Sequence, residues 1–139
     1  MAGLRCNTVL LIDDNPIDNL INRKIIESNR FADHIQVFTS AKSALIFIQE
    51  KLNFEELLAL NTQVVIFLDI RMPEMDGFQF LDEYKKINPE IQSICKIYML
   101  SSTLDPLDKR RISQNKFVDK FFCKPLSNKF AEEINNGEM

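Results

Sequence analysis

The sequence predicts a doubly wound α/β domain, in which helices cover both faces of a parallel sheet. Three observations support this prediction. Five short strand-like segments alternate with helical ones along the 139 residues. The strands at 8–13 and 63–69 are almost wholly apolar, as is typical of strands that are covered on both faces. At two positions a proline directly follows a capping side chain, which marks the start of a helix.

The strands and the main helix starts can be placed in order along the chain. The five predicted strands span 8–13, 34–39, 63–69, 95–101 and 117–123. Asn15 supplies a capping side chain for the first helix, and Pro16 takes its first helical position. Ser40 can cap the second helix, and Asp105 followed by Pro106 opens a later one in the same way. These signals place a helix after the first, second and fourth strands.

Two more segments complete the predicted helical layers. Ser127 can start a short last helix. Residues 50–63 are predicted to extend the second helix, with Leu52, Leu57 and Leu58 covering the sheet. The alternative is that this extension docks a partner.

Composition limits the class of protein. The length fits one domain, since domains usually have about 100–200 residues. A formal net charge of −3 gives no global attraction to nucleic acid or to an anionic membrane, and no apolar run approaches the roughly 18 residues that span a bilayer. The three cysteines, Cys6, Cys95 and Cys123, form no C-x-x-C pair, so a disulfide framework is not expected. We therefore predict a cytoplasmic protein that binds neither nucleic acid nor membrane.

Polar residues follow the strands at the edge where such folds bind ligands. They are Asp13 and Asp14 after the first strand, Asp69 at the end of the third, Ser101 at the end of the fourth, and Lys124 after the fifth. Each has a simpler reading, such as a helix cap or a solvated turn. Three crowded carboxylates repel one another, however, and a hard cation such as Mg²⁺ would relieve this. With a lysine for a phosphoryl group, the set predicts phosphoryl chemistry on an aspartate.

Four motifs carry a family resemblance. They read LLIDDNP (10–16), FLDIRMPEMDGF (67–78), YMLSS (98–102) and FFCKP (121–125). In this order and spacing they resemble the receiver domain of two-component response regulators, over residues 8 to about 134. The resemblance implies a flavodoxin-like fold with strand order 2-1-3-4-5.

The resemblance also implies a role for each residue of the acidic cluster. Asp69 resembles the phosphoacceptor, which takes a phosphoryl group from a sensor histidine kinase or a histidine phosphotransfer protein. Asp14 resembles an acid that ligates Mg²⁺ directly, and Asp13 its partner, which holds metal-bound water. Asp69 and the backbone carbonyl of Arg71 would complete the ligands.

Further roles are implied around this cluster. Ser101 resembles the hydroxyl residue that hydrogen-bonds the acyl phosphate, and Lys124 the lysine that pairs with the phosphoryl group. Phe121 occupies the aromatic switch position, and we expect its ring to lie largely inward. Lys124–Pro125 lies where the family commonly has a cis bond. Turn chemistry alone suggests that Gly77 supplies a positive φ.

The expected organisation is one receiver domain over 1–139, with a core of about 8–134 and no output domain. The signal, passed to an unknown downstream protein or relayed onward, would then leave through the domain's own surface. The expected surface comprises the helix that begins at Pro106, the strand at 117–123 and the last helix, including Lys109, Arg110, Lys120 and Phe130. The chain would be a monomer or form a weak dimer through this surface.

Three other functions are alternatives. An aspartate-nucleophile phosphatase of the haloacid-dehalogenase type would need an acid two residues after Asp69, where this chain has Arg71. A flavin or nucleotide carrier would need a phosphate-cradling loop, but the chain has only three glycines and no G-x-G-x-x-G motif. A phosphate-independent scaffold would not need all five site residues intact. We therefore expect a switch that catalyses only its own phosphorylation and dephosphorylation, and no enzyme acting on other substrates.

Overall fold

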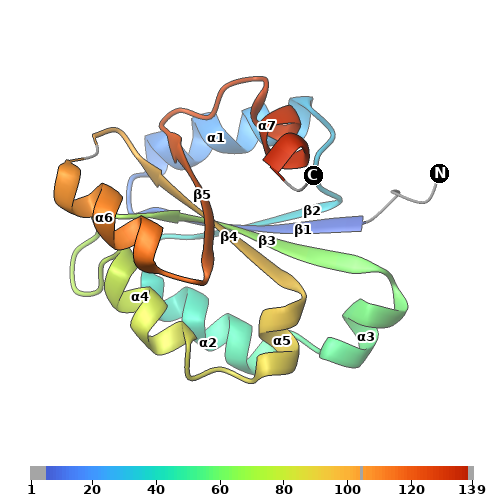
Figure 1. Cartoon of the computed structure of the whole chain (residues 1–139). Helices are drawn as coiled ribbons and strands as arrows, with labels where there is room; N and C mark the ends of the chain where they lie inside the picture. Colours follow the sequence, from blue (N-terminus) through green and yellow to red (C-terminus); the bar gives the residue numbers. More distant parts are fainter. Residues whose placement is uncertain (1–5, 104, 138–139) are drawn as a thin grey trace.

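The predicted parallel sheet is present in the computed structural model, which describes residues 6–103 and 105–137. Its five strands lie in the order β2-β1-β3-β4-β5, which confirms the predicted topology (Figure 1). Their bounds are β1 Cys6–Ile12, β2 His34–Phe38, β3 Thr62–Asp69, β4 Cys95–Ser101 and β5 Val118–Cys123. Each strand lies within two residues of its predicted position.

Helices cover both faces of this sheet. In Figure 1, α1 and α7 lie on one face, and α2, α4 and α5 lie on the other. The bounds are α1 Pro16–Ser28, α2 Ala41–Lys51, α3 Phe54–Ala59, α4 Gly77–Tyr84, α5 Pro89–Ser93, α6 Pro106–Gln114 and α7 Phe130–Gly137. No helix in the described part of the chain is long and apolar enough to cross a membrane.

The predicted capping residues begin their helices as expected. The Asn15 side chain accepts the N–H groups of Ile17 and Asp18 at 2.9 and 3.1 Å. Ser40 and Asp105 cap α2 and α6 in the same way. The last helix is an exception, because it begins at Phe130 and not at Ser127. Residues 127–130 form a turn in which the Ser127 carbonyl accepts the Phe130 N–H.

The predicted extension of the second helix is wrong. Helix α2 ends at Lys51, and Asn53 starts the separate helix α3 by accepting the Glu56 N–H at 3.0 Å. Two adjacent leucines cannot lie on one helix face. Leu57 therefore packs against the core while Leu58 is 59% exposed.

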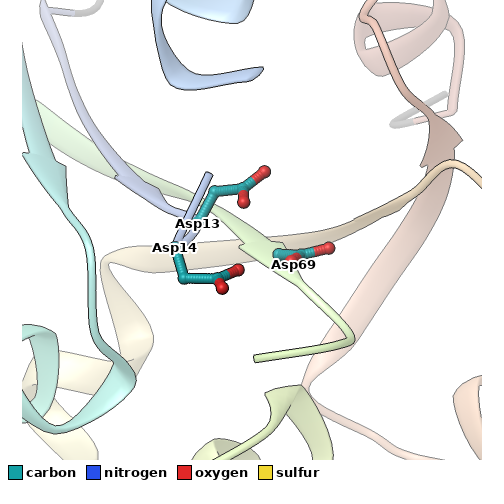
Figure 2. A group of neighbouring side chains, drawn as sticks. All are labelled: Asp13, Asp14 and Asp69. Carbon is teal, nitrogen blue, oxygen red and sulfur yellow. The ribbon is translucent and has the colours of Figure 1, made fainter. Parts of the chain in front are cut away.

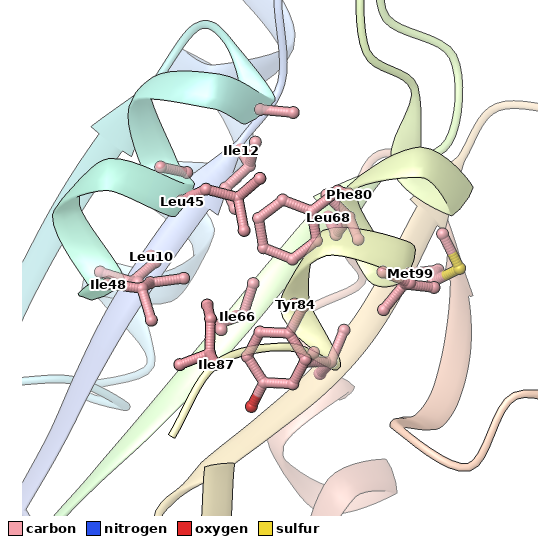
Figure 3. Close-up of a cluster of buried hydrophobic side chains, with 14 of the residues drawn as sticks. Leu10, Ile12, Leu45, Ile48, Ile66, Leu68, Phe80, Tyr84, Ile87 and Met99 are labelled. Carbon is pink, nitrogen blue, oxygen red and sulfur yellow. The ribbon is translucent and has the colours of Figure 1, made fainter. Parts of the chain in front are cut away.

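Two hydrophobic clusters sandwich the sheet because strand side chains alternate between its faces. Figure 3 shows one cluster, in which Leu10 and Ile12 of β1 meet α2 and α4. Val9 and Leu11, their neighbours, belong to the other cluster, under α1 and α7. Phe130 is fully buried in this second cluster, so its predicted place on an exposed output surface is wrong. Its position at the start of α7 turns it toward the sheet.

Candidate functional site

Three carboxylates converge at the carboxyl edge of the sheet. Asp13 and Asp14 directly follow β1, and Asp69 is the last residue of β3 (Figure 2). One carboxylate oxygen from each lies within 4.8 Å of the others. Asp13 and Asp69 are buried, whereas Asp14 is exposed. The structure therefore brings the predicted acidic cluster together.

The neighbouring strands β1 and β3 fix this geometry. Ile12 pairs with Leu68 in register, so the residues that follow them emerge side by side. Two hydrogen bonds of the Asp13 backbone hold this residue in place. The Asp13 N–H donates to the Phe38 carbonyl at 3.0 Å, and the Asp13 carbonyl accepts from the Asn19 side chain at 2.7 Å. Contacts with β2 and with α1 thus hold Asp13 in place at the end of β1.

Lys124 reaches the cluster from the end of β5. Its backbone N–H donates to the Ser101 carbonyl at 3.0 Å, and the Lys124–Pro125 peptide is cis, as the resemblance implied. Its ammonium lies 2.9 Å from an Asp13 oxygen and 3.3 Å from an Asp69 oxygen. A third acid, Asp18 of α1, also lies at 2.9 Å.

Asp18 is a site residue that the sequence reasoning missed. Its position in the first turn of the helix after Asp13 and Asp14 was a usable signal. The first turn of a helix remains close to the strand end that precedes it. Because acids are common in first turns for their interaction with the helix dipole, that position alone did not single Asp18 out.

Burial and charge oppose each other at Asp69. Burial, and then the neighbouring Asp13 carboxylate, raise the pKa of Asp69 to about 6, although Lys124 acts in the opposite direction. Burial lowers the pKa of Lys124, but hydrogen bonds to Asp18 and Asp13 outweigh it, and the net pKa is raised. Lys124 is thus a stable cation, and it only partly offsets the surrounding acids.

The donor set fits a hard divalent cation. Mg²⁺ takes carboxylate, carbonyl and water oxygens, and the three clustered carboxylates supply ligands of this kind. The predicted fourth ligand, the Arg71 carbonyl, lies in the loop after β3. The Arg71 side chain bonds to Asp108 of α6 and also lies 3.6 Å from Asp105. It thereby ties the loop after the acidic cluster to the start of α6.

The two predicted switch residues lie on neighbouring strands. Ser101 ends β4 and is buried; its hydroxyl donates to the Thr103 carbonyl and accepts the Thr103 N–H at 3.2 Å. Phe121 pairs in register with Met99 and packs against the first core cluster, yet it is half-buried. The expectation of a largely inward ring is therefore met only in part.

Gly77 is needed for space and not for a positive φ, which corrects the sequence-based expectation. No described glycine has a positive φ. A Cβ at Gly77 would instead lie 2.6 Å from the Asp69 carbonyl oxygen and 2.8 Å from the Met99 side chain. The start of α4 thus packs directly against the strand end that carries Asp69.

The fold and the site together define the class: an α/β signalling domain with an acidic pocket at the carboxyl edge of its sheet. Residues 9–133 match the family model for the response regulator receiver domain. The chain belongs to this family, the receiver domains of two-component signalling, which act as phosphorylation-activated switches.

Individual relatives agree with this assignment. The chain is 31% identical over 139 residues to the two-component response regulator ORR1 of rice (Oryza sativa subsp. japonica), covering 97% of this chain and 56% of that protein. It thus spans little more than half of that relative. It is also 30% identical over 90 residues to histidine kinase 2 of Arabidopsis thaliana, covering 63% of this chain and 6% of the kinase.

Solved structures show the same fold. A two-component response regulator from Cytophaga hutchinsonii is 30% identical with a TM-score of 0.78, covering 95% of this chain and 96% of that one. The receiver domain of the histidine kinase CKI1 from Arabidopsis thaliana, complexed with Mg²⁺, is 28% identical with a TM-score of 0.78, covering 96% and 92%. One structural relative of this chain is therefore a receiver domain complexed with Mg²⁺.

Proposed function

We propose that Asp69 accepts a phosphoryl group from the phosphohistidine of a sensor histidine kinase or a histidine phosphotransfer protein. One observation carries this proposal: the buried Asp69 carboxylate lies beside two further carboxylates and 3.3 Å from the Lys124 ammonium. Phosphoryl transfer to a carboxylate needs nearby positive charge. Here the Lys124 ammonium supplies one charge, and the three carboxylates form a site for a metal that would supply more. Asp69 is also the third carboxylate of the cluster, so it lies next to any metal bound there.

The proposed transfer begins with an Asp69 oxygen attacking phosphorus. The P–N bond of the phosphohistidine breaks, its electron pair stays on the imidazole nitrogen, and an acyl phosphate remains on Asp69. Lys124 contributes a positive charge next to the phosphoryl oxygens. Mg²⁺, held directly by Asp14, Asp69 and the Arg71 carbonyl and through water by Asp13, would offset the negative charge of the carboxylates and of the phosphoryl group.

The phosphoryl group would act on the switch residues by offering new contacts. The Ser101 hydroxyl would exchange its bond to the Thr103 carbonyl for one to a phosphoryl oxygen. Phe121, on the neighbouring strand, would then turn further into the space beside β4. Because its ring already packs partly against the core, the change at the surface should be modest.

This change would be read at α6, β5 and α7. Lys109 and Arg110 of α6 are exposed there, while Lys120 of β5 donates to the Glu133 carbonyl of α7. A downstream protein would bind this surface, or two copies of the chain would form a weak dimer through it. We further propose that the protein works in the cytoplasm, and that its receiver domain acts on no substrate besides itself.

The experiment is phosphorylation by acetyl phosphate with Mg²⁺, followed by intact mass spectrometry. We expect one base-labile phosphoryl group on the wild-type chain and none on Asp69→Asn. Asp14→Asn should also fail to label, because it loses a metal ligand while keeping Asp69. Equal labelling of wild type and Asp69→Asn would contradict the proposal. Steady release of phosphate from an added phosphomonoester would instead favour a phosphatase.

A further inference from the structure

The Lys124 ammonium has an acidic neighbour for each of its donors. A lysine carries three N–H donors. In this structure three carboxylates surround them, with Asp13 and Asp18 at 2.9 Å and Asp69 at 3.3 Å. The two shorter contacts draw the ammonium toward β1 and α1, and its contact with Asp69, on which a phosphoryl group would form, is the longest of the three.

Asp18 is the one of these three acids whose carboxylate can move away from the Lys124 ammonium. Asp13 is fully buried, and its second oxygen accepts the Asn15 N–H at 2.9 Å, so its carboxylate is fixed at both ends. Asp69 is the residue that would carry the phosphoryl group. The Asp18 side chain is 33% exposed, and a turn about its own bonds would bring its carboxylate from Lys124 into water.

We propose that Asp18 is a positioning residue that competes with the phosphoryl group for the Lys124 ammonium. This inference rests on the proposed phosphorylation of Asp69. A phosphoryl group at Asp69 brings up to about two negative charges and several acceptor oxygens. To bond them, Lys124 moves toward Asp69 and gives up donor capacity now used by Asp18. The resting site therefore contains a built-in competitor, and Asp18 lowers the affinity of the site for a phosphoryl group.

The test compares Asp18→Asn, which removes the charge with little change in size, with Asp18→Glu, which keeps the charge. Glu74→Gln is the matched control, because Glu74 is an exposed acid in the loop after Asp69 and its removal reports a general charge effect. The probe is beryllofluoride with Mg²⁺, titrated by calorimetry at moderate salt to suppress long-range electrostatics. NMR of the Lys124 side-chain ammonium in metal-free protein gives a second readout.

We expect Asp18→Asn to bind beryllofluoride about three- to tenfold more tightly than wild type, on the order of one charge-assisted contact. Its labelling by acetyl phosphate should speed up in the same direction, and the Lys124 ammonium signal should shift without metal. Asp18→Glu and Glu74→Gln should stay within about twofold of wild type.

Three results would overturn the inference. Weaker binding by Asp18→Asn would show that Asp18 holds Lys124 in its working position and does not compete. Unchanged binding, or an equal gain in Glu74→Gln, would show that the contact has no specific effect. If wild type itself neither bound beryllofluoride nor became labelled on Asp69, the proposed function would fail. The two failures are thus distinguishable.

Discussion

Replacing Asp69 by Asn should change how the stability of the metal-free protein depends on pH. Burial and Asp13 raise the pKa of Asp69 from 3.8 to about 6 in the folded state. The folded protein therefore binds a proton more readily than the unfolded chain between about pH 4 and pH 6. Folding stability must fall as the pH rises through this window, because ionising Asp69 costs more in the folded state. Asparagine never ionises, so Asp69→Asn lacks this loss.

The size of the effect follows from the difference between the two pKa values. About two pKa units correspond to about 3 kcal/mol, since one unit is about 1.4 kcal/mol. Near pH 4.5 only about 1 kcal/mol of this difference in free energy of unfolding should be present, because the folded carboxyl is still protonated there. By pH 7 the Asp69→Asn protein should be the more stable by up to about 3 kcal/mol. Mg²⁺ should reduce this difference in free energy of unfolding, because it binds the ionised folded form of the wild type and stabilises it.

Urea unfolding in EDTA between pH 4.5 and 7.5 measures this difference. Far-UV circular dichroism is the suitable probe, because the chain has no tryptophan. Asp33→Asn serves as a control, since Asp33 is exposed and precedes β2 at the opposite edge of the sheet. Parallel stability curves for wild type and Asp69→Asn across the whole pH range would refute the reasoning about Asp69.

Three further substitutions test packing and charge around the site and in the core, each by chemical denaturation. Gly77→Ala should lower the free energy of unfolding by about 1–2 kcal/mol, because its Cβ would press on the backbone at Asp69; an unchanged value would mean that the loop yields easily. Arg71→Ala should cost about 1–3 kcal/mol by leaving the buried Asp108 carboxylate without its cation, and adding Asp108→Asn should recover part of this. Phe130→Ala should cost about 3–5 kcal/mol as a core residue, whereas a change below about 1 kcal/mol would return Phe130 to the surface.

The features that sequence predicted well depend on local chemistry. The cap at Asn15 depends only on Asn15, Pro16 and the first N–H groups of the helix. The buried strand that ends at Asp69 likewise follows from the apolar residues directly before it. Asp13 and Asp69 could be placed together because parallel strands share one carboxyl edge.

The features that sequence missed depend on contacts across the fold. Asp18 contacts Lys124 from 106 positions away, and its place in the first turn after Asp13 and Asp14 does not by itself identify Lys124 as its partner. Turn chemistry predicts a positive φ at Gly77, whereas the residue's size is limited by the Asp69 carbonyl at the end of β3 and by the Met99 side chain of β4. The break between α2 and α3 could have been predicted from the sequence, because Asn53 is a typical capping residue. The leucines at 52, 57 and 58 instead favoured one continuous helix.

The site also depends on the chain being complete. The bond between Lys124 and Asp13 joins residues 111 positions apart, one following β1 and the other following β5. In a chain still being synthesised, Asp13, Asp14 and Asp69 are made before β5, so they then lack the ammonium that offsets their charge. Any phosphorylation that needs Lys124 must wait until the last strand has joined the sheet. Nascent chains, or chains truncated before β5, would therefore not be phosphorylated and would not signal. No separate mechanism would be needed to keep them out of the signalling pathway.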